Sequence, residues 1–204
     1  MLMNSRRNEK ALGYVALLLL LCQLSAILLS WILNAAGVTM VRSLLSAQGI
    51  KWFMGSFVDN ISSPLLVWLL LLSIAYGALR YSGLISVFTK DGNASRRTFA
   101  LRVVIAEICV FVIVLLLLSV APHALLLNAM GELFPSSSFS RCLVPYIAFC
   151  VCFISVSYGS LSGRYDDVAD IFRSLIVGIE QSSHLLFLYI LVAQLYFSVC
   201  YMLS

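Results

Sequence analysis

The sequence predicts an all-α polytopic membrane protein, and three observations lead to that prediction. Charged residues make up 11% of the 204 residues, against roughly 25% in soluble domains. Apolar residues make up 62%, and five stretches free of charge are long enough for a helix of about 20 residues to cross a bilayer. The stretches lack strict two-residue alternation, so they indicate helices rather than barrel strands. This composition excludes a secreted disulfide scaffold, a disordered tail and an ordinary cytosolic enzyme.

The charge-free stretches place about five transmembrane helices in a single transmembrane domain spanning 1–204. The first stretch is longer than the apolar core of a secretory signal, which has about 7 to 15 residues, so we expect it to remain as a span. The expected spans are 12–33, 64–88, 103–121, 143–161 and 184–203.

Two further segments are expected to be helices lying in the membrane interface. The segment 167–180 repeats apolar residues with helical spacing, opposite a polar face. The segment 39–58 is less regular, but Trp52, Phe53 and Phe57 beside Lys51 suit the headgroup boundary, and Gly49 is expected to bend it.

The basic residues predict the orientation, because cytoplasmic loops carry an excess of Lys and Arg. Ten of the 13 Lys and Arg residues fall before the first span, between the second and third, or after the fourth. The other three are Arg42, Lys51 and Arg141. We therefore expect a cytoplasmic N-terminus and an outside C-terminus in a bacterial inner membrane. The net charge of +4 then reflects membrane topology, and no nucleic-acid partner is expected.

Glu107 is the leading candidate for proton or cation coupling. An ionised carboxylate within the hydrocarbon costs several kcal/mol and usually faces a partner or a cavity. The alternative is that Glu107 lies only one turn inside a helix beginning near Val103, where Arg102 and water keep it solvated.

Other polar residues within spans have both a functional and a structural interpretation. Ser157 and Tyr158 belong to a polar helix end that could be a buried seam or a substrate path. Gln194, in the middle of the fifth span, is expected to need an interhelical partner. His123 and His184 could titrate near neutral pH, or could simply cap and pack.

The sequence contains no set of residues that would support catalysis, so we expect no enzyme activity. It has no GxSxG, HExxH or P-loop motif. The six Cys residues form no CxxC pair and are interpreted as packing residues, and the two histidines are too far apart to suggest one metal site. No metal and no cofactor are expected.

Two blocks carry marks of a known family. The block 41–88 contains Gly49-Ile50, Asn60, Pro64-Leu65 and Ser82 to Ile85, and the block 143–198 contains Tyr158-Gly159, Gly163, Asp167-Val168 and Ala193-Gln194. In this order they resemble the AbgT family of p-aminobenzoyl-glutamate transporters, over about half of the chain. The resemblance implies a homo-oligomer, or a subunit, that helps to move a small organic anion across the membrane. With the polar residues above, the substrate or ion-coupling candidates are Glu107, Asn60, Ser157, Tyr158 and Gln194.

An alternative function follows from the departures from that family. Its members are thought to bind substrate between two re-entrant hairpins, whereas a continuous third span takes the place of the first hairpin here, and the chain ends before the second. Arg80 also stands where the family usually has Glu. The alternative is a non-transporting scaffold or accessory subunit that keeps the dimer framework and binds another membrane protein. In both cases we expect contact with the lipid bilayer, and the charge bias favours parallel copies.

Overall fold

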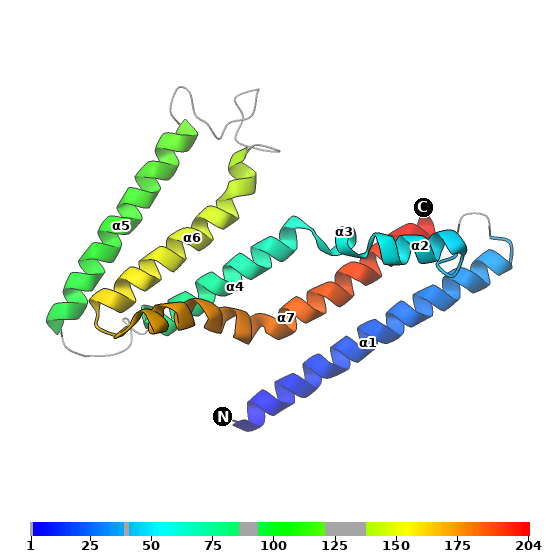
Figure 1. The fold of residues 1–204 in the computed structure, drawn as a ribbon, viewed down its shortest axis with the longest axis horizontal. Helices are drawn as coiled ribbons and strands as arrows, with labels where there is room; N and C mark the ends of the chain where they lie inside the picture. Colours follow the sequence, from blue (N-terminus) through cyan, green and yellow to red (C-terminus); the bar gives the residue numbers. More distant parts are fainter. Residues whose placement is uncertain (1, 39–40, 86–93, 121–137) are drawn as a thin grey trace. The chain divides into compact units, whose positions relative to one another are not determined.

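A computed structural model gives the fold, and it describes residues 2–38, 41–85, 94–120 and 138–204 (Figure 1). These residues form helices and no strand, which confirms the predicted all-α fold class. The helices are α1 (Leu2–Ala35), α2 (Ala47–Gly55), α3 (Phe57–Ile61), α4 (Pro64–Ser82), α5 (Ala94–Val120), α6 (Ser138–Leu161) and α7 (Val168–Leu203).

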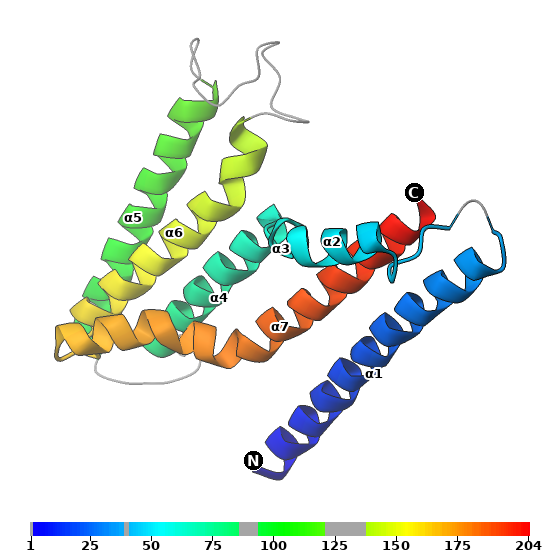
Figure 2. The ribbon, with the colours of Figure 1, turned by 45° about the vertical axis from the view of Figure 1, so that its right-hand side comes forward.

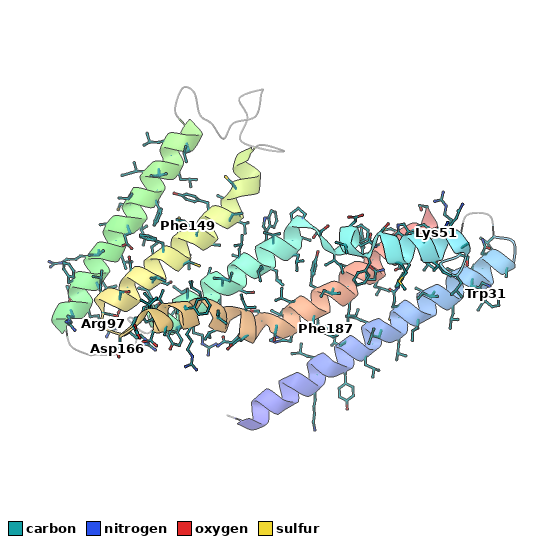
Figure 3. The ribbon with its side chains drawn as sticks, viewed as in Figure 1. Trp31, Lys51, Arg97, Phe149, Asp166 and Phe187 are labelled. Carbon is teal, nitrogen blue, oxygen red and sulfur yellow. The ribbon has the colours of Figure 1, made fainter. Side chains whose placement is uncertain are left out.

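Five of these helices are long and apolar enough to cross a membrane, which identifies the chain as a polytopic membrane protein. Their candidate spans are Lys10–Ala35, Pro64–Ser82, Arg96–Leu118, Cys142–Leu161 and Val168–Leu203. Large apolar side chains such as Trp31 and Phe187 are about half exposed and project from their helices (Figure 3). In a bilayer such side chains face lipid rather than water.

Some helix ends differ from the expected ones for local reasons. Helix α4, the second expected span, ends at Ser82 rather than near 88. The reason is that Gly83 takes a positive φ of 76°, the left-handed conformation that often follows a helix. Residues 86–88 of the expected span lie outside the described part. Helix α5, the third expected span, begins at Ala94, nine residues before the expected start at 103. The basic residues Arg96, Arg97 and Arg102 are therefore helical.

The expected interfacial segments also take different forms. The segment 167–180 and the fifth span are joined in the single 36-residue helix α7, because no proline or glycine separates them at 181–184. In place of one helix over 39–58 there are α2, which Ser46 caps by accepting a hydrogen bond from Gly49 N at 3.0 Å, and α3, which follows Ser56. Gly49 does not bend a helix; a Cβ there would lie 2.4 Å from Ser43 O. Residues 39–40 lie outside the described part.

The chain forms two compact units, and α4 and α7 contribute to both. The first unit comprises Met1–Val67 and Ser183–Ser204, and the second comprises Trp68–Ser182. Each unit has its own packing and its own polar contacts.

The first unit joins α1, the segment 41–61 and the C-terminal part of α7 (Figure 2). Ser30 Oγ accepts a hydrogen bond from Leu44 N at 3.0 Å, which ties the chain after α1 back onto that helix. Arg42 N donates to Met202 O at 3.0 Å, and the rings of Trp52 and Tyr201 stack 4.3 Å apart. These contacts hold the end of α7 against α2 and the segment before it.

The second unit contains a very close crossing of α4 and α7 at small residues. A Cβ on Gly178 would lie 1.9 Å from Ser73 O, and a Cβ on Gly77 would lie 2.3 Å from Gly178 N. Ser174 on α7 is fully buried beside the crossing. Both helices therefore present a Ser-x-x-x-Gly face, the pattern by which membrane helices bring their backbones together.

Candidate functional site

Glu107 lies in the middle of helix α5, within its candidate membrane span. It lies eleven residues from each end of the span Arg96–Leu118. At a rise of about 1.5 Å per residue it is roughly 16 Å from either end of that candidate span. Helix α5 starts at Ala94 rather than near 103, and its basic residues Arg96, Arg97 and Arg102 all precede Glu107. Arg102 is exposed, and its long side chain can extend toward the headgroups.

Helix α6 supplies a hydrogen-bond partner for this carboxylate. The Ser157 hydroxyl donates to Glu107 Oε1 at 2.6 Å, across the packed α5–α6 pair. The second oxygen, Glu107 Oε2, is buried and has no hydrogen-bond partner. The structure thus brings together two of the candidate residues and leaves one carboxylate oxygen unsatisfied.

The surroundings of the Glu107–Ser157 pair are apolar on both sides. One turn toward the start of α5, Val104 packs in a buried cluster with Ala100, Ile154 and Tyr158. One turn in the other direction, Phe111 meets the rings of three α6 residues edge-on: Tyr146, Phe149 (labelled in Figure 3) and Phe153. Tyr158, another candidate, is therefore a packing residue of the apolar cluster, next in sequence to Ser157.

A second polar contact lies in the first unit, between the candidates Asn60 and Gln194. Asn60 Nδ2 donates to Gln194 Oε1 at 3.4 Å, and both side chains are buried. The interhelical partner expected for Gln194 is thus Asn60 of α3. The Gln194 Nε2 atom is buried and has no hydrogen-bond partner. This pair and the Glu107–Ser157 pair belong to different units and are separate contacts.

Of the two histidines, only His184 lies in the described part of the chain, and no hydrogen bond joins it to either contact. His184 is exposed on α7, and His123 lies outside the described residues. Within the described ranges, no group of three His, Cys, Asp or Glu side chains is arranged to hold a metal ion.

The geometry can be set beside known proteins. Comparisons with protein families, with curated proteins and with solved structures each find no match.

Several polar contacts of the first unit were not anticipated from the sequence. Tyr189 OH and Ser63 Oγ lie 2.5 Å apart, and Tyr189 OH also donates to Ile61 O at 3.1 Å. Gln23 Nε2 of α1 donates to Ser198 Oγ of α7 at 2.9 Å. Polar residues at mid-helix positions in 184–203 were the available signal, because each needs a partner in the membrane. Their partners could not be found from the sequence, as they lie more than 100 residues away.

Replacing Asn60 or Gln194 by Leu is expected to destabilise the protein modestly. Interhelical hydrogen bonds in membranes contribute about 0.6 kcal/mol on average and up to about 1.7 kcal/mol. The Asn60→Leu and Gln194→Leu variants should therefore each lower the free energy of unfolding in detergent, and the double variant should lose less than the sum. Strictly additive losses would show that the two amides do not interact.

Proposed function

We propose that this protein takes part in moving a small organic anion across a bacterial inner membrane, as a homodimer or as a subunit. The observation that carries the proposal is the carboxylate of Glu107 at the middle of α5, with one oxygen bonded to Ser157 and the other buried without a partner. Ionisable residues within transmembrane segments are costly, and those that occur commonly mark ion pathways and proton relays.

Such a carboxylate can couple an ion gradient to substrate movement. When the carboxylate is ionised it carries a negative charge in an apolar surrounding, and binding of a proton or a cation removes that charge. If the charged and neutral forms of Glu107 favour different conformations of the protein, ion binding shifts the equilibrium between those conformations. An ion gradient can then drive the conformational change in one direction during each transport cycle. The substrate class comes from the resemblance to p-aminobenzoyl-glutamate transporters, whose substrate is an aromatic amino-acid conjugate.

The proposed orientation has the N-terminus in the cytoplasm and the C-terminus outside. Ten of the 13 Lys and Arg residues then fall on the cytoplasmic side. Five membrane-spanning helices, an odd number, agree with termini on opposite sides. Copies that share this orientation would assemble in parallel.

Reconstituted protein is expected to take up p-aminobenzoyl-glutamate when an ion gradient is imposed. The measurement uses purified full-length protein in liposomes, with a proton gradient or a sodium gradient applied in separate experiments, and protein-free liposomes as the control. If the protein moves no aromatic or amino-acid-conjugate anion under either gradient, alone or with partners that co-purify with it, transport is contradicted.

A second candidate function is a non-transporting membrane scaffold or accessory subunit. The specific observation in its favour is that several polar contacts within the first unit tie elements of this chain to each other, as Asn60 does with Gln194 and Gln23 does with Ser198. Contacts of this kind stabilise a framework. Affinity purification in mild detergent distinguishes the two functions: a stoichiometric, unrelated membrane protein supports the scaffold, and stabilisation of the isolated protein by the anion supports the transporter.

A further inference from the structure

We infer that Glu107 binds a proton and not a metal cation, so that the coupling ion of the proposed transport is H⁺. The coupling part of this inference rests on the proposed function. The proton site itself rests on the geometry around Glu107 and can be tested without any transport assay.

In the described part of the chain, the side-chain oxygen bonded to Glu107 is that of Ser157, and no group of three His, Cys, Asp or Glu side chains is arranged to hold a metal ion. Hard cations are held by several oxygen ligands from carboxylates, carbonyls and water. In transporters, sodium sites commonly draw carbonyl oxygens from unwound helices. Both α5 and α6 continue as helices through the Glu107–Ser157 pair, so their carbonyls there are engaged in helical hydrogen bonds. Nearby, Phe111 O accepts a further hydrogen bond from Tyr146 OH at 2.7 Å.

A proton requires no such ligand set. It forms one O–H bond with the unpartnered Oε2 of Glu107, and the side chain goes from a charge of −1 to neutral. The hydroxyl of Ser157 continues to donate to Oε1 in either state. Neutralisation of the carboxylate removes the free-energy cost of a charge among apolar residues. A bound proton achieves this without any further ligand.

Among the described residues of α5 and α6, the titratable groups around the Glu107–Ser157 pair are tyrosines, cysteines and Arg102. On α6, Cys150 packs against the apolar cluster that contains Tyr158, and Tyr146 bonds to Phe111 O. On α5 itself, Arg102 and Cys109 are both exposed. Beyond Gly159, at the end of α6, Tyr165 packs near Tyr81. All the tyrosines and cysteines are neutral in their ordinary state near neutral pH, so Glu107 is the one acidic side chain of the Glu107–Ser157 contact that can carry a negative charge there.

Labelling with dicyclohexylcarbodiimide tests the proton site directly. This apolar reagent needs a protonated carboxyl: the acid adds across the carbodiimide, and the adduct rearranges to a stable acylurea that peptide mass spectrometry locates. We expect the peptide containing Glu107 to be labelled in the full-length protein, with labelling rising several-fold from alkaline to mildly acidic pH and unchanged by sodium at fixed pH. The Glu107→Gln variant should lose this label, and Glu180→Gln, at an exposed carboxyl of α7, should keep it.

Ser157→Ala supplies an independent readout. The hydroxyl donates to Glu107 Oε1, so its loss should change the profile of labelling against pH. Ser157→Thr should restore the original profile, and Ser155→Ala is the matched control, since the buried Ser155 hydroxyl bonds to no other group. Protection by sodium at fixed pH, or no label on Glu107 at any pH, would overturn the inference. If Glu107 is labelled but the protein moves no anion, only the proposed function is contradicted. If sodium drives anion uptake and Glu107 is never labelled, only the proton site is contradicted.

Discussion

Gly178→Leu is expected to disrupt the second unit, with a loss of at least about 3 kcal/mol in the free energy of unfolding. Any Cβ at Gly178 collides with the backbone of Ser73, at 1.9 Å from its carbonyl oxygen. Backbone atoms cannot turn aside as a flexible side chain can, so α4 and α7 would have to separate. The measurement is the unfolding midpoint of the purified protein in mild detergent, by circular dichroism or by release of a thiol-reactive dye.

Gly13→Leu is the matched control for this substitution. Gly13 also lies within a helix, α1, but a Cβ there meets nothing within 4 Å. The leucine should therefore change stability by no more than about 0.5 kcal/mol. Equal losses at Gly178 and Gly13 would show that the substitution acts through lipid contact or another effect common to both helices, and that the close crossing of α4 and α7 does not stabilise the protein.

Glu107→Gln is expected to reduce gradient-driven uptake by at least about tenfold, which lies within the usual range of coupling free energies, about 1 to 3 kcal/mol. Glutamine has nearly the same shape and can still accept the hydrogen bond from Ser157, but it cannot change its charge. The measurement is the initial rate of anion uptake into liposomes with and without the gradient. Uptake that proceeds down the anion's own gradient should be less affected, because it does not require coupling.

Two further variants test whether the loss of uptake comes from the loss of a titratable carboxyl at position 107. They are Glu107→Asp, which keeps a carboxyl there, and Glu180→Gln, which removes a carboxyl elsewhere. Aspartate keeps a titratable group on α5 at a shorter reach, so part of the gradient-driven uptake should return. Glu180 is exposed on α7, and its replacement should leave uptake unchanged. If Glu107→Gln matches the unaltered protein under both gradients, coupling through this residue is wrong.

The membrane-spanning part of the fold was predictable from composition, because an uninterrupted apolar stretch in lipid has few alternatives to a helix. Helix ends were less predictable. The expected end near 88 missed Gly83, whose positive φ terminates α4, and the expected interface helix at 167–180 proved continuous with the last span. Helical periodicity identifies a face, but it does not show where a helix stops when no proline or glycine breaks it.

The candidate residues could be found one by one, but their pairing could not. Glu107 and Ser157 were both notable as polar residues in spans, yet 50 positions separate them, and only the packing of α5 on α6 brings them together. The crossing of α4 and α7 was missed although both helices carry the signal, in SIAYG at 73–77 and SLIVG at 174–178. Small residues four apart are common in membrane helices, so the pattern does not show which two faces meet.

The central claim is that five helices cross the bilayer, with the N-terminus in the cytoplasm and the C-terminus outside. Reporters fused to each end of the full-length chain in bacterial cells test it most directly, with a fluorescent protein that matures in the cytoplasm and a phosphatase that is active outside. We expect fluorescence from the N-terminal fusion and phosphatase activity from the C-terminal fusion. The same reporter active at both ends would place the termini on one side and contradict the claim.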